Sequence, residues 1–229
     1  MNYLAHIYLA SQSDEAMIGA LLGDFAKADY AGAYTPEIER EIAIHRKVDA
    51  FTDSHPVVLA AKELFEPGRR RFAGILLDMF YDHVLIVNWT RYSDQPVDEL
   101  IERFYRALEA RRAILPERLQ RMLPYMVGQD WLGSYREFAA VELAAKRVAQ
   151  RLSRNGDLLV AGLEDLRKDY DRLSAGFHEF FPELTGFTGR LREQMQGERH
   201  DLALSQGTSR LPPAGHNRDI KENTCSKKS

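Results

Sequence analysis

The segment FAGILLDMFYDHVLIVNW, residues 72–89, is long and almost entirely apolar. Its length would suit a membrane span, but Asp78, Asp82 and His83 lie near its middle. Each ionisable side chain at that depth would cost about 3 kcal/mol in a bilayer. A helix that is apolar nearly all round is typical of the centre of a soluble protein. We therefore expect residues 72–89 to form the central helix of a soluble fold.

Helical periodicity dominates the rest of the sequence, and no run alternates apolar and polar residues as a half-buried strand would. In residues 35–53, Thr35 is the expected N-cap and Pro36 occupies the first helical position. In residues 157–181, apolar positions recur at alternating spacings of four and three, as in helices packed lengthwise, and Pro182 is expected to end this helix. The sequence thus predicts an all-α helical bundle, with further helices at residues 13–27, 57–65, 97–112 and 141–156.

The composition is that of an ordinary globular protein. Of the 229 residues, 45% are hydrophobic and 28% are charged, and this length suits one domain with a sizeable core. The formal net charge of −3 does not favour nucleic acid or a membrane surface as a partner, so any basic site must be local. We expect a single domain over residues 1–195.

The two ends of the chain add two expectations. The first residues, MNYLAHIYLA, lack the basic region and cleavage site of a signal peptide. After about Gln196 the sequence has few large apolar residues and many turn formers, so residues 196–229 are expected to form a disordered tail. Cys225 is the single cysteine, so no intramolecular disulfide can form. These features together favour a cytoplasmic protein.

The segment EIAIHRKVDAFTDSHP, residues 41–56, carries the first candidate site residues. On a helical wheel, His45 and Asp49 share the stripe of the core-facing residues, Asp53 borders it and Lys47 lies opposite. A buried carboxylate is unfavourable unless it is hydrogen-bonded, ion-paired or bound to metal. We therefore expect the polar groups on this inward face to contact a hydrogen-bond donor, a cationic group or a metal ion.

The central helix repeats the anomaly. Asp78 and Asp82 lie four residues apart on one face, with His83 next to Asp82, and His6 and Asp24 lie in or beside apolar runs upstream. Imidazole and carboxylate groups together suit Mn²⁺, Fe²⁺, Mg²⁺ or Zn²⁺, and the absence of clustered cysteines argues against a structural zinc site. The pattern indicates a metal-dependent hydrolase, and it names no substrate.

Each candidate also has a simpler interpretation. His6 suits a hydrogen-bonded core histidine, and Asp24 suits a solvated carboxylate at a helix end. His55, before Pro56, suits a turn residue. Charged residues usually lie on a solvated surface, and this interpretation applies to Lys27, Arg46, Lys47, Arg69, Arg70 and Arg71. The concentration of histidines and aspartates in the first 83 residues is what favours a site.

Several of these segments together resemble the acyl carrier protein phosphodiesterase family. The matching motifs are MNYLAHIYLA, GALLGDFAK, IHRKVDAFTDSHP, LDMFYDHVL with the following Trp89, and QDWLGSYR around Trp131. They stand in the right order and spacing over roughly residues 1–185. The family is regarded as a distant relative of the HD phosphohydrolases, so the resemblance implies a rearranged HD-like helical domain. The pair Asp82-His83 reverses the order of the HD dyad.

The resemblance also implies an activity and its participants. Members of this family are described as hydrolysing the phosphodiester that joins 4′-phosphopantetheine to a serine of holo-acyl carrier protein, which leaves the apo carrier. They use a divalent metal, typically Mn²⁺, with Mg²⁺ or Fe²⁺ as alternatives. The expected partner is therefore the acidic carrier protein, with no nucleic acid and no membrane span.

The positions that the matching motifs carry over are His6, Asp24, His45, Asp49, Asp53, Asp78, Asp82 and His83. Our hypothesis gives metal binding to Asp24, His45, Asp82 and His83. Asp49 or Asp78 would orient a ligand or accept a proton, and His6 or His55 would protonate the leaving serine oxygen. Substrate binding falls to Lys27, Arg46, Lys47, Asp53, Arg69, Arg70 and Arg71, whose basic members would steady the phosphate or dock the carrier.

Two alternatives remain open. The protein could be an HD-type phosphohydrolase of small nucleotides, which activity on free nucleotides would favour. It could instead be a non-catalytic helical binding protein whose buried polar residues form a structural network. That alternative predicts no tightly bound metal, and it predicts that His45→Ala and Asp82→Ala damage folding rather than activity alone.

Overall fold

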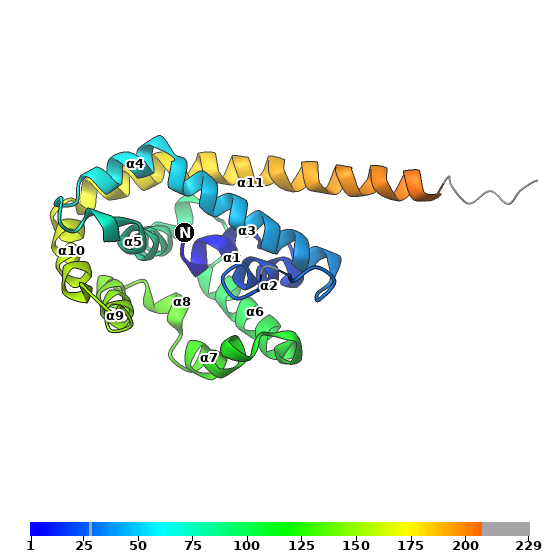
Figure 1. The fold of residues 1–229 in the computed structure, drawn as a ribbon, viewed down its shortest axis with the longest axis horizontal. Helices are drawn as coiled ribbons and strands as arrows, with labels where there is room; N and C mark the ends of the chain where they lie inside the picture. The colour runs from blue at the N-terminus through cyan, green and yellow to red at the C-terminus, as the bar shows by residue number, and fades with distance from the viewer. Residues whose placement is uncertain (28, 208–229) are drawn as a thin grey trace, which may run out of the picture. The chain divides into compact units, whose positions relative to one another are not determined.

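The computed structural model describes residues 1–27 and 29–207, and all regular structure within these ranges is helical, which confirms the all-α prediction (Figure 1). The α-helices are α1 (Tyr3–Leu9), α2 (Asp14–Leu22), α3 (Pro36–Ser54), α4 (Pro56–Glu63), α5 (Ala73–Val87), α6 (Val97–Ala110), α7 (Glu117–Gly128), α8 (Trp131–Ser134), α9 (Phe138–Ala149), α10 (Gly156–Lys168) and α11 (Tyr170–Gly207). Short 3-10 helices lie at Arg70–Phe72, Trp89–Arg91 and Arg112–Ile114.

Residues 1–192 pack into one compact unit, and residues 193–207 belong to a second. Helix α11 continues through Gly207, past the expected domain boundary at residue 195. Residues 208–229 lie outside the described ranges, so the disordered tail stays a prediction there. The rearranged HD-like topology likewise stays a prediction.

Helix α5 is the central helix, as its composition predicts. Leu76, Phe80, Val84 and Leu85 are completely buried, and α5 packs against α1, α4, α9 and α10 (Figure 1). The helix ends at Asn88, whose side-chain amide donates to the Val84 carbonyl oxygen. Within the described ranges, no helix combines the length and the apolar character needed to cross a membrane.

Two N-terminal caps follow the sequence closely. The Thr35 side chain accepts a hydrogen bond from the Ile38 backbone N–H, and Pro36 opens α3 as expected. Ser13 caps α2 in the same way by accepting from the Ala16 N–H at 3.0 Å. These caps fix the start of the two helices that pack along each other and that carry much of the site.

The predicted helix over residues 157–181 begins as expected, but the prediction of one continuous helix that ends at Pro182 was wrong. The structure has two helices there, α10 and α11, and Pro182 lies inside α11 rather than at its end. Proline costs about 3 kcal/mol in a helix interior because it removes a backbone hydrogen bond. Phe180, Phe181 and Leu184 are completely buried around it, and burial of such side chains contributes more than that cost.

Candidate active site

Helices α1 and α3 bring two histidines and an aspartate together in the compact unit. His6 Nε2 lies 3.1 Å from Asp49 Oδ1, and His45 Nε2 lies 3.2 Å from Asp49 Oδ2. Each residue offers one possible ligand atom, and these atoms all lie within 4.8 Å of one another. We call His6, His45 and Asp49 the His–Asp cluster. It is a group that can hold a metal ion, in agreement with the prediction of a metal site.

The end of helix α2 fixes the orientation of His45. The ring Nδ1–H donates to the Ala20 carbonyl oxygen at 2.6 Å, which leaves Nε2 facing Asp49 and, at 3.5 Å, Asp24 Oδ1. The ring also lies directly against Gly23, where a Cβ atom would come within 2.1 Å of the His45 Cγ. A backbone acceptor on one ring nitrogen is the usual way in which proteins orient the other toward a metal.

Of the two histidine rings of the cluster, only His45 is protonated at neutral pH. The two rings are stacked, with centroids 3.8 Å apart and planes inclined by 16°. Burial and the charge of His45 lower the pKa of His6 to about 4. Burial also opposes protonation of His45, but hydrogen bonds to Asp24 and Asp49 outweigh it and raise its pKa to about 9. Without metal, the cluster therefore holds one proton on His45 next to an ionised Asp49.

This charge pair gives the metal-free protein a pH-dependent stability. The pKa of His45 rises from an ordinary 6.5 to about 9, so its stabilisation is complete below pH 6.5 and disappears as pH rises through 9. Asp49 and Asp24 are 39% and 45% exposed, so solvent screening reduces the effect to about 1–2 kcal/mol. Urea unfolding of chelator-treated protein at pH 6 and pH 9 measures it. The His45→Gln variant should lack this difference, and parallel changes in both proteins would contradict the assignment.

Two further carboxylates lie beside the cluster. The Met1 ammonium group lies 3.3 Å from Asp49 Oδ1 and 3.1 Å from Asp78 Oδ1, so a cation already lies between these two carboxylates. Burial raises the pKa of Asp78. Asp24 and Asp78 line a cavity of about 370 Å³, which we call the acidic cavity. Positive charge is thus favoured at this point of the structure.

Asp82 and His83 lie elsewhere, although both were predicted as metal ligands. Asp82 is completely buried, and its carboxylate accepts from the backbone N–H groups of Leu4 at 2.8 Å and Ala5 at 3.0 Å. His83 donates from Nδ1 to the Tyr135 carbonyl oxygen, and its Nε2 accepts from the Tyr170 hydroxyl. Of the four predicted ligands, the structure brings only Asp24 and His45 together.

Asp82 therefore has a structural task that bears on the site. It satisfies N–H groups in the first turn of α1, the short helix that carries His6. Asp82→Ala should lower the free energy of unfolding by about 3 kcal/mol, because two buried donors lose their acceptor. Asp98→Ala, which removes an exposed partner of Arg136, should change it by less than about 0.5 kcal/mol. Urea unfolding compares the two, and equal effects would show that Asp82 does not anchor α1.

The other predicted catalytic and substrate-binding residues in and around α3 and α4 lie outside the His–Asp cluster. His55 accepts from the Val57 N–H and lies 3.3 Å from Glu183, so it caps α4. Asp53 is exposed and pairs with Lys62 at 2.9 Å. Lys27 and Lys47 are exposed, and the Arg46 guanidinium lies 5.0 Å from the Tyr30 ring centroid.

The predicted docking run Arg69–Arg71 is partly neutralised within the protein. Arg69 pairs with Asp165 at 2.9 Å and with Glu164 at 3.1 Å, and Arg70 pairs with Glu63 at 2.8 Å. Arg71 is exposed, with its guanidinium 4.7 Å from the Phe72 ring centroid. A docking role for this run stays a prediction, with two of its three charges already balanced.

Comparison with known proteins identifies the family. The sequence model described as "Acyl carrier protein phosphodiesterase" matches residues 1–184. The chain belongs to the acyl carrier protein phosphodiesterase family. A relative of that name from Klebsiella pneumoniae subsp. pneumoniae is 34% identical over 197 residues, which cover 86% of this chain and 100% of the relative. Another, from Photorhabdus laumondii subsp. laumondii, is 32% identical over 183 residues, which cover 80% and 92%. No solved structure shows a significant match.

Membership of this phosphodiesterase family confirms the resemblance seen in the sequence, and it confirms that the protein is a hydrolase. The matched region contains the whole His–Asp cluster and both carboxylates of the acidic cavity. Sequence reasoning missed Gly23, whose lack of a side chain makes room for His45. It also missed Arg118, which lines the acidic cavity from a helix that the periodicity did not predict.

Proposed function

We propose that this protein hydrolyses the phosphodiester between 4′-phosphopantetheine and a serine of holo-acyl carrier protein, with a divalent metal bound by the His–Asp cluster. The observation that carries the proposal is the meeting of His6, His45 and Asp49, within 4.8 Å, in a chain whose relatives are named acyl carrier protein phosphodiesterase. A divalent metal held by such ligands is suited to phosphodiester hydrolysis.

The donor set fits a metal of intermediate hardness. His45 offers Nε2 while Ala20 holds its Nδ1, and Asp49 lies between both imidazoles. Asp24, 3.5 Å from His45, is the nearest further oxygen donor. Mixed imidazole and carboxylate ligands suit several divalent ions, and the family resemblance implies Mn²⁺, with Mg²⁺ or Fe²⁺ as alternatives. When bound, such an ion lowers the pKa of a water molecule and neutralises charge on the phosphoryl oxygens.

The remaining residues would manage protons and the substrate. Asp78 lines the acidic cavity, and burial raises its pKa, so it is better suited to proton transfer than an ordinary aspartate. Hydrolysis forms a bond from water oxygen to phosphorus and breaks the bond from phosphorus to the serine oxygen. A proton must reach that oxygen, and Asp78, which lines the cavity together with Asp24, is our candidate to supply it. His55, which caps α4, is less suited to this task.

One experiment tests the proposal. Metal-stripped protein is incubated with holo-acyl carrier protein, with and without Mn²⁺, and the carrier is weighed by mass spectrometry. Loss of the phosphopantetheine mass only when Mn²⁺ is present supports the proposal, and an unaltered carrier with folded protein refutes it. Hydrolysis of free nucleotides in a parallel incubation would instead favour the nucleotide phosphohydrolase. The cytoplasm as location stays a prediction.

A further inference from the structure

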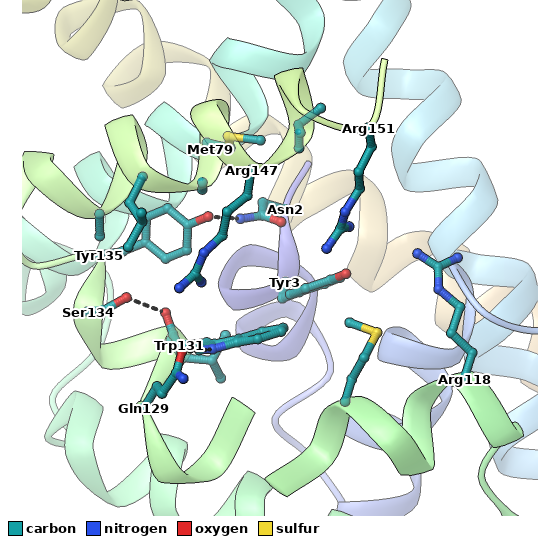
Figure 2. A pocket seen from close by; sticks show the side chains of 16 residues that line it. Asn2, Tyr3, Met79, Arg118, Gln129, Trp131, Ser134, Tyr135, Arg147 and Arg151 are labelled. Carbon is teal, nitrogen blue, oxygen red and sulfur yellow. Dashed lines mark hydrogen bonds between the residues drawn. The ribbon is translucent and has the colours of Figure 1, made fainter. Parts of the chain in front are cut away.

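A second cavity, of about 300 Å³, adjoins the acidic cavity, and Figure 2 shows its lining. Asn2, Tyr3, Met79, Arg118 and Val148 line both cavities. We call the second cavity the arginine pocket because three guanidinium groups line it, those of Arg118, Arg147 and Arg151. The two cavities are therefore neighbours: Asp24 and Asp78 line only the acidic cavity, Arg147 and Arg151 line only the arginine pocket, and Arg118 lines both.

The arginines of this pocket differ from the other arginines near the site in their surroundings. Among the side chains that the structure describes, no carboxylate forms an ion pair with Arg118, Arg147 or Arg151, whereas Arg69 and Arg70 are paired. Arg118 stacks on Phe25, with its Cζ 5.5 Å from the ring centroid, and Phe25 lines the acidic cavity. Because Arg118 lines both cavities, it is the arginine placed to bind an anion that extends from one cavity into the other.

Much of the remaining wall of the pocket is apolar or aromatic, with polar side chains from Asn2, Gln129 and Ser134. Met79 and Leu132 are buried residues of this lining, and the aromatic side chains of Tyr3 and Trp131 belong to it as well (Figure 2). Tyr135 is fixed by a 2.8 Å hydrogen bond from the Asn2 side chain to its hydroxyl. Such a wall suits methyl and methylene groups, and the guanidinium groups can donate to amide carbonyls. The pocket thus calls for a ligand with an anionic head and a long uncharged arm.

We propose that the arginine pocket holds the 4′-phosphopantetheine group, with Arg118 on the phosphate and the pantetheine arm along the apolar wall. This inference rests on the proposed function. The group has one phosphate, two amides and several methyl and methylene groups. The phosphate matches the arginines of the pocket, and the methyl and methylene groups match its apolar lining. Because the serine is the leaving group, 4′-phosphopantetheine is the product that stays in the pocket, and it should compete with the holo carrier.

A ligand series on the wild-type, Mn²⁺-loaded protein tests the occupant. Isothermal titration calorimetry is carried out with free 4′-phosphopantetheine, pantetheine, inorganic phosphate and AMP. We expect 4′-phosphopantetheine to bind at least about ten-fold more tightly than each of the others, because it alone engages both the arginines and the wall. Equal binding of inorganic phosphate would mean that the wall contributes nothing. Tighter binding of AMP would assign the pocket to a nucleotide. Either result overturns the proposal.

Two pairs of variants test the place of binding. Arg118→Ala should weaken 4′-phosphopantetheine about ten- to hundred-fold, and Arg118→Lys should weaken it less. Arg121→Ala is the matched control, since Arg121 lies on the same helix and pairs with Glu117. Ala144→Phe should fill the pocket and weaken binding by a similar factor, whereas Ala139→Phe places the same ring on an exposed position of α9. Circular dichroism verifies the fold of each variant.

The outcomes separate this inference from the proposed function. If the wild-type protein leaves the holo carrier intact, the proposed function fails. If it releases 4′-phosphopantetheine while Arg118→Ala and Ala144→Phe both bind that product as the wild type does, the function stands and the pocket assignment is wrong. The ligand series uses only the wild-type protein, so it tests the occupant of the pocket even if a variant misfolds.

Discussion

Asp49→Asn is expected to lower kcat/KM for release of 4′-phosphopantetheine by at least about a thousand-fold. Asp49 is the one residue of the His–Asp cluster that contacts both histidines, at 3.1 Å and 3.2 Å. Asparagine keeps the shape of the side chain but removes the negative charge that holds a cation there. A catalytic metal contributes several kcal/mol to the transition state, and about 4 kcal/mol corresponds to a thousand-fold change in rate.

The measurement combines two readouts. Mass spectrometry of the carrier gives the rate, and elemental analysis of the purified protein gives its Mn²⁺ content, which should fall together with the rate. Asp94→Asn is the matched control, because Asp94 is exposed in the loop before α6 and should leave both values unchanged. An Asp49→Asn protein that keeps its metal and its activity would remove the His–Asp cluster from the mechanism.

The sequence predicted those helices whose local residue pattern is sufficient to identify them. The apolar run of α5 and the Thr35-Pro36 start of α3 rest on local physics, namely burial of an apolar helix and capping of a free N–H. Helices α1, α7 and α8 were not predicted. Residues 3–9 and 131–134 are too short to show a period, and Pro124 lies inside α7. The same limit explains Pro182, where packing in α11 outweighs a local rule.

The site could be predicted in part for a related reason. A helical wheel shows which face a residue shares, and it correctly paired His45 with Asp49, four residues apart on α3. It cannot show what an inward polar residue meets. Asp82 and His83 on α5 looked like ligands because they interrupt an apolar helix, but backbone N–H groups and a tyrosine pair satisfy them. The partners of buried polar groups depend on long-range contacts that a single segment does not encode.

The arginine pocket illustrates the same limit on a larger scale. Its lining comes from the start of α1, from α5 and from residues 118–151, so its members are far apart in the sequence. Arg118, Arg147 and Arg151 carry no signal of their own in the sequence, since arginines are ordinary surface residues. Only the fold shows that they converge on one cavity next to two carboxylates.

Gly23→Ala is the second change with a large expected effect, because it acts on His45 without removing any ligand. A Cβ atom at position 23 would lie 2.1 Å from Cγ and 2.6 Å from Nδ1 of the His45 ring, far inside van der Waals contact. The ring cannot move aside freely, since Ala20 holds its Nδ1 and the His6 ring stacks on it at 3.8 Å. Displacement of a catalytic group by about 1 Å lowers rates by about a hundred-fold, and we expect at least that loss in kcat/KM.

Gly74→Ala provides the control for this change. A Cβ atom there would meet only the Lys62 Cε, at 3.8 Å, so the substitution should fit and should stabilise α5 by about 0.5–1 kcal/mol through its higher helix propensity. Each variant adds one methyl group to the wild-type protein. A loss of activity and of bound Mn²⁺ in Gly23→Ala alone therefore identifies the His45 ring as the affected part. If Gly23→Ala kept its full Mn²⁺ content and rate, His45 would tolerate displacement and could not be a metal ligand. The glycine at the end of α2 is thus a direct test of whether the position of one imidazole ring decides activity.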